Sequence, residues 1–455
     1  MRQEIIAIFD IGKTNKKLLL FDTALNLISS TEEKFQQVTD DDGFECDNID
    51  LVEKWIRETV NSLVLSAEYD LKGINFTTYG ASLAYLDGHG KRTGPVYNYL
   101  KPLDPGIAEQ LYGRYGGKEE FCRVTASPAL GMLNSGLQAL WLKRIHPEVF
   151  SRVKTILHFP QYLSYCLTGE IYSEHTSIGC HTATWDFDSG SYHQWVADEA
   201  LPFAQPVPVT TLFTATIKGR KIRVGTGLHD SSASLAPYFS GKRGNFILLS
   251  TGTWCIAMNP FNGEKLTTGQ LARDCLCYMD INGNPVKSSR LFLGSMHDRA
   301  VSHLSRYFKI PESSFMLIKP DARILSKLME KVRDEKVFAA MINNQPLLKD
   351  EPDLFVFNNS IESYHLLMAE LTDLAIESVN LIIPEDDATT DLFITGGFSK
   401  NLLFRKLVAS SYPHLAVYTS EISNATALGA AVVTLSALDP GSVTAPELGL
   451  SEVKL

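Results

Sequence analysis

Apolar and polar positions form the same pattern twice along the chain. In "AIFDIGKTNKKLLLFD" (residues 7–22), two apolar runs flank a polar turn at 12–15. In "GNFILLSTGTWCIAMNPF" (244–261), two apolar runs flank a turn of Ser, Thr and Gly. Each pattern predicts a β-hairpin. Because the hairpins lie roughly half a chain apart, they indicate two related lobes rather than a short repeat.

Helical periodicity follows the first hairpin. In "DLVEKWIRETVNSLV" (50–64), Leu51, Trp55, Ile56 and Val60 fall on one face and predict an amphipathic helix. Residues 74–87 are typical of a strand running into a polar turn, and 118–170 are typical of a helical stretch. Residues 221–238 and 391–409 each predict a strand, a turn and a helix. Residues 423–438 predict a helix of small residues capped by Asn424.

The composition limits the class of protein. A chain of 455 residues, 44% of them hydrophobic and 21% charged, is expected to form about two to three globular domains. The formal net charge of −10 argues against nucleic acid or an anionic membrane as the main partner. The seven cysteines lack the spacing of a disulfide framework, and no long apolar run marks a signal peptide or a membrane span. We therefore expect a soluble, cytoplasmic protein.

The turn of the first hairpin has the composition of a phosphate-binding loop. A phosphate needs nearby backbone N–H donors, which Gly and small residues permit, together with hydroxyl groups and a cation. The segment from Asp10 to Lys17 supplies all of these, and Asp10 is a candidate partner of Mg²⁺. The segment 250–253 supplies a second set, and the Gly396–Gly397 pair leaves room for an adenine or a ribose. None of these turns matches the P-loop sequence.

Each turn also has a simpler interpretation. A Gly/Thr turn between strands is most often only a hairpin turn. The lysines at 13, 16 and 17 fit solvated hairpin charges, and Gly396–Gly397 fits a tight strand-to-helix connection. Three such turns in this order are nevertheless less expected by chance than any one of them alone.

Asp230, in the segment "GLHDSSAS", fits two roles. An Asp directly before "SSASLAP" is a good N-cap for a helix beginning at Ser231. A carboxylate at a helix N-terminus stays ionised because the helix dipole favours the anion. In a cleft, such a carboxylate can accept a proton from a sugar hydroxyl. The two roles do not exclude each other.

The order and spacing of seven segments make the chain resemble the FGGY carbohydrate kinases over essentially its whole length. Within that family the chain is most similar to the rhamnulokinase-like branch. "TYGASLAYLD" (78–87) is similar to that branch's Thr-Trp-Gly-Val-Asp pattern, and "LSTGTW" is similar to its Ser-Ser-Gly-Thr-Trp pattern. The seven segments are "FDIGKTNKKLLLFD", "LWLKRIHPEVF", "PQYLSYCLTGE", "GLHDSSAS", "LLSTGTW", "ITGGFSKN" and "ATALGAA".

The resemblance implies an α/β fold of two duplicated, actin-like (ribonuclease-H-type) lobes with a nucleotide and sugar cleft between them. The expected lobes are 1–240, with the sugar site, the first phosphate hairpin and the catalytic Asp, and 241–455, with the second phosphate loop and the adenosine motif. ATP with Mg²⁺ would phosphorylate a hydroxyl of a ketose such as rhamnulose, fuculose or xylulose. By this resemblance Asp230 is the catalytic base, Asp10 is associated with Mg²⁺, and the protein is a monomer or a homodimer.

The same motifs imply the nucleotide-binding residues. Lys17 replaces the family's usual Arg, so that a bidentate phosphate contact becomes a point charge. Phe398 replaces a common third Gly of the adenosine motif. The implied residues are Gly12, Thr14, Asn15 and Lys17 in the first phosphate hairpin, Thr251, Gly252 and Thr253 in the second phosphate loop, and Gly396, Gly397 and Asn401 in the adenosine motif.

The implied sugar site departs further from the family pattern. Tyr79 replaces a Trp of the branch, and Ser82 and Gln161 each replace an Asp, which favours a deoxy or shorter ketose. Tyr99 and Lys101 replace an acid and an arginine. The aromatic rings of Tyr79 and Tyr97 fit a hydrophobic core equally well. The implied sugar-binding residues are Tyr79, Ser82, Tyr97, Asn98, Gln161, His229 and Asp230.

Two alternatives stay open at this point. The first is another substrate class in the same fold, such as a pentulose or a polyol. The second is an ATP-binding actin-like protein, or a degenerate kinase acting as a sensor, without sugar kinase activity. The substituted sugar positions favour the second alternative, and the presence of both Asp10 and Asp230 argues against it.

Overall fold

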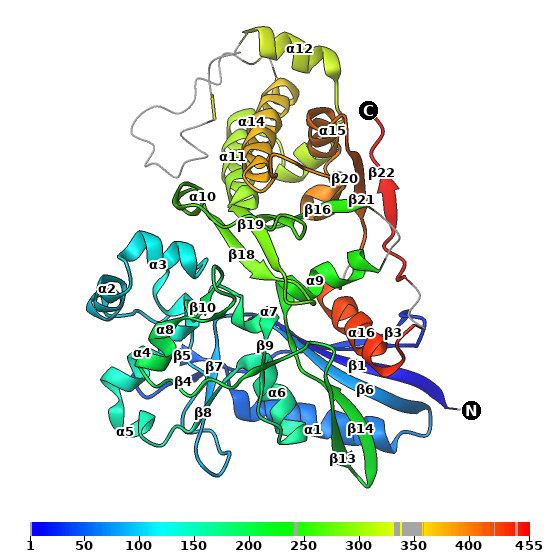
Figure 1. Cartoon of the computed structure of the whole chain (residues 1–455). Helices are drawn as coiled ribbons and strands as arrows, with labels where there is room; N and C mark the ends of the chain where they lie inside the picture. Colours follow the sequence, from blue (N-terminus) through cyan, green and yellow to red (C-terminus); the bar gives the residue numbers. More distant parts are fainter. Residues whose placement is uncertain are drawn as a thin grey trace. The chain divides into compact units, whose positions relative to one another are not determined.

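Two mixed β-sheets with the same strand pattern organise the chain (Figure 1). The computed structural model describes residues 2–240, 244–331, 337–338, 357, 359–422, 424–441 and 445–455. The chain divides into unit 1 (Met1–Lys242, Gly263–Val286 and Asn424–Glu447) and unit 2 (Arg243–Asn262, Lys287–Ser423 and Leu448–Leu455). The expected division into functional lobes at 240/241 stays a prediction.

The first hairpin forms the centre of the unit 1 sheet. Strand β1 (Gln3–Ile11) pairs antiparallel with β2 (Lys16–Phe21) and parallel with β6 (Tyr69–Thr78). The sheet order is β13-β14-β6-β1-β2-β3, and β15 (Leu228–His229) pairs with β6. The near-continuous apolar run of β1 is buried on both faces, as is typical of a strand covered by helices on both sides.

Alternation along β1 determines which side chains reach the functional side of the sheet. Ile5, Ala7, Phe9 and Ile11 pack in one hydrophobic cluster with residues of helix α1 (Ile49–Leu65). Because successive side chains of a strand point to opposite faces, Asp10 points away from α1. Helix α16 (Ala425–Leu438) packs against β1, β6 and helix α9 (Asp230–Phe239).

The remaining elements of unit 1 complete the main sheet with β3, β13 and β14 and add small sheets and short helices. Their bounds are β3 Leu27–Glu33, β4 Val38–Thr39, β5 Glu45–Cys46, β7 Leu83–Leu86, α2 Pro105–Arg114, α3 Lys118–Val124, η1 Gly131–Leu133, α4 Ser135–Ile145, α5 Pro147–Phe150, β8 Thr155–His158, α6 Phe159–Thr168, β9 Ser173–Glu174, α7 His175–Ile178, β10 Trp185–Asp186, β11 Ser191–Tyr192, α8 Gln194–Asp198, β12 Pro206–Val207, β13 Leu212–Ile217, β14 Arg220–Gly225, α10 Thr268–Ala272 and β18 Cys275–Met279.

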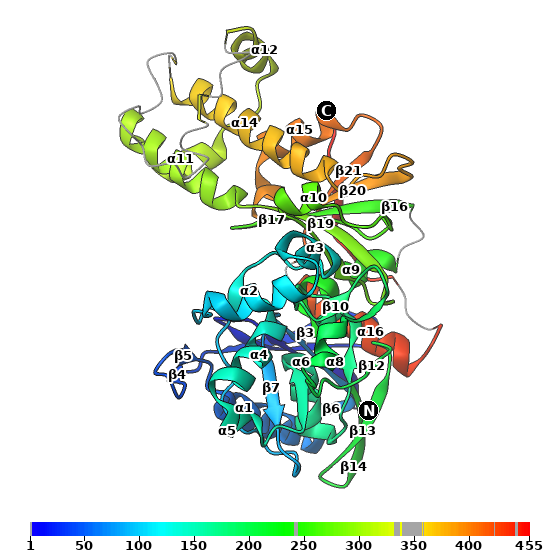
Figure 2. The same ribbon diagram turned by 60° about the vertical axis from the view of Figure 1, so that its left-hand side comes forward.

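The second hairpin forms the centre of the unit 2 sheet. Strand β16 (Asn245–Thr251) pairs antiparallel with β17 (Cys255–Asn259) and parallel with β20 (Thr389–Gly396). The strand order β19-β17-β16-β20-β21-β22 repeats the hairpin-plus-parallel-strand pattern of unit 1. Helix α14 (Ser360–Asn380) contacts both α11 and α15 (Figure 2). The other bounds are β19 Pro285–Leu291, α11 Leu293–Phe308, η2 Glu312–Leu317, α12 Ala322–Lys331, η4 Gly397–Lys400, α15 Leu402–Ser411, β21 Ala416–Ser420 and β22 Leu450–Glu452.

The structure confirms both predicted hairpins and both strand–turn–helix units, with two local corrections. Leu51 does not face the core: it is 39% exposed, and Val52 takes the buried position beside Ile56 and Val60. The segment 74–87 is not one strand but the end of β6 and all of β7. Among the described residues, no helix has both the length and the apolar composition needed to cross a bilayer.

Candidate functional site

Asp10 stands at the end of β1 with both carboxylate oxygens held by hydroxyl groups. Thr77 donates to Oδ1 at 2.7 Å and Thr426 donates to Oδ2 at 2.9 Å. Thr77 is the parallel partner of Asp10 on β6, so the sheet register itself brings the two side chains together. Burial raises the pKa of Asp10, and the nearby Asp230 adds to the rise, whereas the hydroxyl bonds and Lys17 oppose it. Asp10 and Asp230 therefore lie within electrostatic reach of each other.

Asp230 is the first residue of α9, which corrects the prediction that it is the N-cap. His229 has the extended backbone of the cap position, with φ −70° and ψ 136°, so the helix begins one residue earlier than expected. The backbone N–H of Ser231 donates to Oδ1 of Asp230 at 2.6 Å, and the Ser231 hydroxyl donates to the same atom at 3.3 Å. Solvent reaches 35% of the side chain. Protein atoms surround the rest, and this burial raises the pKa of Asp230 to about 6.

His229 connects Asp230 to the interior of unit 1. Its Nε2 lies 3.2 Å from Oδ1 of Asp230 and 3.0 Å from Sγ of Cys180. Its ring stacks on Tyr278, with centroids 5.7 Å apart. Burial lowers the pKa of His229 to about 3, so the imidazole is neutral near pH 7. The position is enclosed, since only 5% of His229 is exposed.

The three lysines of the first hairpin have different environments. Nζ of Lys13 and Nζ of Lys16 each lie 2.9 Å from the carboxylate of Asp47. Lys16 is buried, which excludes the interpretation of it as a solvated charge. Lys17, on the opposite face of β2, is the cross-strand partner of Asp10. Of the three lysines, Lys17 is therefore the one beside Asp10.

Asp47 also organises two aromatic side chains near the hairpin. The hydroxyl of Tyr79 donates to Asp47 at 2.5 Å. The ammonium of Lys13 lies 5.2 Å from the ring centroid of Tyr79 and 5.4 Å from that of Tyr99, in cation–π geometry. Burial raises the pKa of Tyr99, and Asp230 and Asp47 add to the rise. Tyr99 is thus near the carboxylates of both residues.

The implied sugar residues do not all share one environment. Tyr79 packs on Phe159 in the hydrophobic cluster that includes β1 and α1. Tyr97 belongs to a different cluster, where its ring meets Trp141 edge-on at 4.9 Å. Ser82 and Asn98 are both buried. The side chain of Asn98 donates to the carbonyl of residue 45 at 2.9 Å and accepts from the N–H of residue 100.

Gln161 supports the segment that leads to Asp230. It is fully buried on α6, and its Nε2 donates to the carbonyl oxygens of Thr226 and Gly227 at 3.2 and 3.0 Å. Its Oε1 has no hydrogen-bond partner among the described residues. One amide nitrogen therefore braces the strand end that carries His229.

The first turn presents small polar groups at the tip of the hairpin. The N–H of Gly12 donates to the carbonyl of Asn15 at 2.9 Å and closes the turn. A Cβ at Gly12 would lie 3.0 Å from that carbonyl oxygen, so the turn leaves little room for a side chain. Thr14 is exposed. Oδ1 of Asn15 is buried and has no partner within the described chain.

In unit 2, Thr251 binds the turn that follows β20. Its hydroxyl donates to the carbonyl of Thr395 and accepts the N–H of Phe398 at 3.0 Å. Gly396 has φ +84°, and a Cβ there would lie 1.7 Å from the carbonyl oxygen of Thr251. Only glycine allows the two strand ends to approach this closely.

The other predicted nucleotide residues of unit 2 divide into open and structural positions. Gly252 and Thr253 are exposed at the hairpin tip, and a Cβ at Gly397 would meet nothing within 4 Å. Asn401 is buried as the N-cap of α15, where it accepts the N–H of Phe404 and donates to the hydroxyl of Tyr364 at 2.8 Å. Asn401 therefore has a structural role whether or not a nucleotide binds beside it.

Sequence reasoning missed several polar residues around the site. Thr77 lies in a strand that was predicted, and its pairing with Asp10 follows once the register is known. Thr426 is 416 positions from Asp10, and Asp47 lies in an irregular loop, so no local pattern indicated either one. Cys180 shows no spacing signal and reaches His229 only through the fold.

Solved structures of carbohydrate kinases are similar over nearly the whole chain. A carbohydrate kinase from Novosphingobium aromaticivorans is 24% identical with a TM-score of 0.79, covering 98% of this chain and 96% of its own. A ligand-bound xylulose kinase from Lactobacillus acidophilus is 15% identical with a TM-score of 0.76, covering 99% and 93%. A Plasmodium falciparum glycerol kinase with ADP is 16% identical with a TM-score of 0.70, covering 95% and 89%. These matches establish the two-domain, actin-like fold.

Sequence comparison identifies the family. Residues 5–201 match the N-terminal domain of the FGGY family of carbohydrate kinases, and residues 243–327 match a C-terminal domain of the same family. The two matches together span more than half of the chain and follow the order of the family's domains. The chain is a sugar kinase that belongs to the FGGY family of carbohydrate kinases.

Proposed function

We propose that this enzyme transfers the γ-phosphoryl group of ATP to a hydroxyl of a ketose, with Asp230 as the general base. The proposed substrates are a deoxyhexulose or a pentulose, such as rhamnulose, fuculose or xylulose, used in carbohydrate catabolism. Similarity to xylulose kinases supports a ketose, and the Thr-Tyr-Gly segment from residue 78 supports the rhamnulokinase-like branch. A cytoplasmic location and a monomeric or homodimeric state stay predictions.

The environment of Asp230 is the observation that carries this proposal. Oδ1 receives the Ser231 N–H and hydroxyl and faces His229, whereas the described residues include no hydrogen-bond partner of Oδ2. A carboxylate held by one oxygen keeps the other free to accept a proton. Because burial raises the pKa of Asp230 to about 6, the group is ionised near pH 7 but is more basic than an ordinary aspartate.

The proposed step moves one proton and one phosphoryl group. Oδ2 of Asp230 takes the proton of the ketose hydroxyl as the hydroxyl oxygen bonds to the γ-phosphorus. The bond from phosphorus to the bridging oxygen breaks, and ADP leaves with that electron pair. Little covalent chemistry is asked of the protein, so positioning and charge stabilisation account for most of the rate.

The residues beside Asp10 fit a Mg²⁺–nucleotide. Mg²⁺ takes one or two carboxylates and keeps several waters, and Asp10, whose two oxygens are oriented by Thr77 and Thr426, would supply one carboxylate. When bound, Mg²⁺ would neutralise charge on the phosphates. Lys17 would hold a phosphate oxygen as a point charge, and N–H groups of residues 13–15 in the turn would donate to others.

The proposed second phosphate loop and adenosine seat come from unit 2. Thr251 fixes the strand ends through its two hydrogen bonds, and the N–H of Gly252 closes the turn on the carbonyl of Trp254 at 2.8 Å, which leaves the N–H of Thr253 as the proposed phosphate donor beside a glycine that lets a phosphate approach. Gly396 and Gly397 would admit the adenosine, since a side chain at Gly397 meets only open space. Asn401 would act by holding this turn.

On the sugar side, His229, Tyr79 and Ser82 are the proposed inner residues. Asp47 joins them through Tyr79 and partly compensates for the missing acids of the family pattern. Tyr97, Asn98 and Gln161 would support the pocket from behind, since all three are buried. Oε1 of Gln161 is buried and has no hydrogen-bond partner among the described residues.

A substrate panel tests the proposal. Purified protein is assayed for ADP release with Mg–ATP and rhamnulose, fuculose, xylulose, gluconate or glycerol. We expect the highest kcat/KM with one of the three ketoses. Turnover only with gluconate or glycerol would overturn the ketose assignment, and calorimetry showing no Mg–ATP binding to folded protein would overturn the kinase step.

A further inference from the structure

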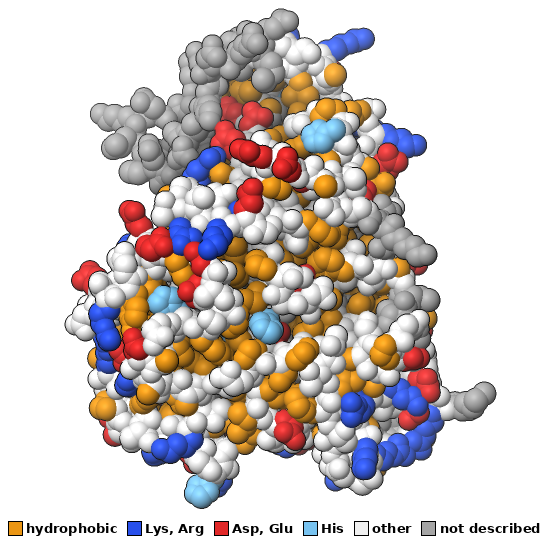
Figure 3. Space-filling view, viewed as in Figure 1, with side chains coloured by type: hydrophobic (Ala, Val, Ile, Leu, Met, Phe, Trp, Pro, Cys, Tyr) orange, Lys and Arg blue, Asp and Glu red, His pale blue; other side chains and the backbone are white. Residues whose placement is uncertain are grey.

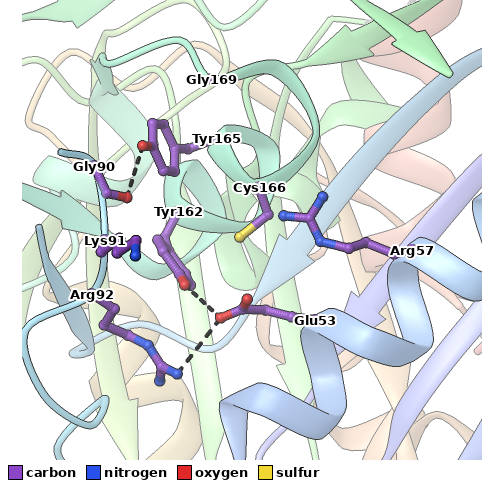
Figure 4. A pocket seen from close by; sticks show the side chains of 9 residues that line it. All are labelled: Glu53, Arg57, Gly90, Lys91, Arg92, Tyr162, Tyr165, Cys166 and Gly169. Atoms are coloured by element: carbon purple, nitrogen blue, oxygen red, sulfur yellow. Dashed lines mark hydrogen bonds and ion pairs between the residues drawn. The ribbon is translucent and has the colours of Figure 1, made fainter.

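A cavity in unit 1 lies outside every residue assigned to nucleotide, metal or sugar. Its volume is about 470 Å³, within the roughly 300–1,000 Å³ of small-molecule sites. On the face drawn in Figure 3, basic and acidic side chains are interspersed. The lining residues come from α1, from the turn after β7, and from α6 (Figure 4). They are Glu53, Arg57, Gly90, Lys91, Arg92, Tyr162, Tyr165, Cys166 and Gly169.

The wall formed by the turn after β7 is fixed in place. The hydroxyl of Tyr165 donates to the carbonyl of Gly90 at 2.9 Å, which ties the turn to α6. Gly90 has φ +74°, and a Cβ there would lie 2.0 Å from that hydroxyl oxygen. The carboxylate of Asp87 is directed to the N–H groups of His89 and Lys91 within the same turn. The cavity is therefore bounded by a defined surface rather than by a loose loop.

The acidic side chain that lines the cavity, Glu53, already has partners. Glu53 accepts the hydroxyl of Tyr162 and lies 3.7 Å from Nη2 of Arg92. Arg92 also pairs with Asp50, one turn before Glu53 on α1. Figure 4 shows the contacts of Glu53 with Tyr162 and Arg92. The charges of Glu53 and Asp50 are thus directed to Arg92.

Two basic side chains, Arg57 and Lys91, remain toward the cavity. Over the described residues, neither Arg57 nor Lys91 makes a side-chain hydrogen bond or an ion pair. Nε of Arg92 is buried and has no hydrogen-bond partner there either. Burial raises the pKa of Cys166 to about 12 and raises that of Tyr162 as well, so neither group supplies an anion near pH 7. The cavity has more cationic than anionic groups left unpaired.

From this arrangement we propose that the cavity between α1, α6 and the turn at 87–92 binds a small phosphomonoester, with Arg57 and Lys91 contacting its phosphate. Guanidinium and ammonium groups are the usual partners of phosphate oxygens. The stacked rings of Tyr162 and Tyr165, 6.3 Å apart, provide an apolar wall for the rest of the molecule. The same oxyanion chemistry is offered by inorganic phosphate and by sugar phosphates.

Helix α6 links the cavity to the proposed active site. It carries Tyr162, Tyr165 and Cys166 on the cavity side, and Gln161, which donates to the carbonyls of Thr226 and Gly227. Ser164 of the same helix donates to the carbonyl of Gly225 at 2.7 Å. Helix α6 therefore contributes both to the cavity and to the support of the segment that leads to Asp230.

Calorimetry on the full chain tests the site. Ribose 5-phosphate, inorganic phosphate and uncharged ribose are titrated with Mg²⁺ and a non-hydrolysable ATP analogue present at saturation. We expect ribose 5-phosphate to bind with one site per chain and inorganic phosphate to bind more weakly at the same site. Arg57→Gln and Lys91→Gln should each weaken binding by about tenfold, because each removes one charged contact.

Lys54→Gln is the matched control, since Lys54 lies on the same helix, is 67% exposed and pairs with Glu58. It should leave the affinity unchanged, and basal kinase turnover should be unchanged in all three variants. Binding by the Arg57→Gln/Lys91→Gln double variant that equals wild type would overturn the proposal. Equal affinity for ribose and ribose 5-phosphate would overturn it as well.

Discussion

The hairpins β1–β2 and β16–β17 occupy the same place in their sheets but carry different groups where the first strand ends. Each has a turn glycine whose N–H closes the turn, Gly12 to Asn15 at 2.9 Å and Gly252 to Trp254 at 2.8 Å. Two residues before that glycine, unit 1 has Asp10, whereas unit 2 has Ser250. The shared geometry thus bears a carboxylate in one unit and a hydroxyl in the other.

The contacts between each hairpin and its neighbouring parallel strand also differ. In unit 1, Thr77 of β6 donates its hydroxyl to the carboxylate of Asp10. In unit 2, the hydroxyl of Thr251 is used on the backbone of the β20 turn, and Gly396 lets the two backbones approach. One hairpin orients a charged side chain, and the other shapes a backbone surface. This difference agrees with the proposal that unit 1 supplies the base and the metal carboxylate and that unit 2 supplies the backbone surface for the nucleotide.

The largest expected effect is on turnover, from Asp230→Asn in unit 1. Asparagine keeps an oxygen that can accept the Ser231 N–H, but it cannot take a proton. We expect kcat to fall by about 10²–10⁴-fold with little change in ATP affinity. In the wild type, kcat/KM should fall as pH drops through about 6, where the raised pKa places protonation of Asp230.

Steady-state rates against ATP and ketose, from pH 5 to 8, measure both effects. Turnover of Asp230→Asn within threefold of wild type would remove the base from unit 1 and leave Asp230 as a helix-terminus residue only.

The second-largest expected effect is on the free energy of unfolding, from Gly396→Ala in unit 2. Gly396→Ala places a Cβ 1.7 Å from the carbonyl oxygen of Thr251, at φ +84°. Left-handed strain and overpacking together should lower the free energy of unfolding by about 3 kcal/mol. Gly12→Ala is the matched change in unit 1, where the Cβ would lie 3.0 Å from the carbonyl oxygen of Asn15. It should cost about 1 kcal/mol.

Urea unfolding of both variants, followed by circular dichroism, provides the comparison. Equal losses at Gly396 and Gly12 would contradict the idea that close backbone approach is special to the second hairpin.

Helices and strands could be predicted wherever the pattern of neighbouring apolar and polar residues determines them. Alternation identified both hairpins, and the 3.6-residue period identified α1. The period did not identify every core residue of α1, because it predicts Leu51 on the buried face. The structure buries the adjacent Val52 instead. The duplication followed from the two hairpins, and the matching strand orders of the two sheets bear it out.

The polar environment of the site could not be predicted, because it depends on long-range contacts. Two of three hairpin lysines are held by Asp47, more than thirty positions away, and Asp10 is held by Thr426. The helix-terminus role of Asp230 was misplaced by one residue, since sequence alone does not fix where the backbone turns helical. Tyr97 stays a predicted sugar residue, although its ring lies in a hydrophobic cluster.

Removing the hydroxyl of Thr251 should weaken unit 2 at the same turn. Thr251→Val keeps the shape but leaves the N–H of Phe398 and the carbonyl of Thr395 without this partner. We expect a loss of about 2 kcal/mol in unfolding free energy. Thr251→Ser keeps the hydroxyl and should recover most of the loss. Similar stability of the Val and Ser variants in urea unfolding would show that the hydroxyl does not hold the turn.

Asp10→Asn tests the carboxylate that distinguishes unit 1. The amide can keep one hydroxyl bond but loses the negative charge beside Lys17. We expect the KM for Mg–ATP to rise by about tenfold, because a charged contact to the metal is lost. The KM for ketose should change little. A rise confined to the ketose would place Asp10 on the sugar side instead. Titration of Mg²⁺ at fixed ATP separates the two outcomes.

The smallest effect concerns stability and has a definite sign. Burial raises the pKa of Asp230 to about 6 in the folded protein, above its ordinary value of 3.8, so the folded state binds the proton more tightly than the unfolded state. The contribution of this group to stability is therefore present below about pH 4 and is lost as pH rises through about 6. Since a third of the side chain is exposed, we discount the effect for solvent screening to about 1 kcal/mol.

Asp230→Asn, which does not ionise, should be more stable than wild type by that amount at pH 8 and equal to it at pH 4. Asp188→Asn in the same unit should instead be less stable than wild type at both pH values, because Arg123 lowers the pKa of Asp188 below 3.8 and the contribution of that carboxylate is lost only at more acid pH. Urea unfolding at the two pH values measures both differences. A lower free energy of unfolding for Asp230→Asn than for wild type at pH 8 would mean that the ionised carboxylate stabilises unit 1, which contradicts this prediction.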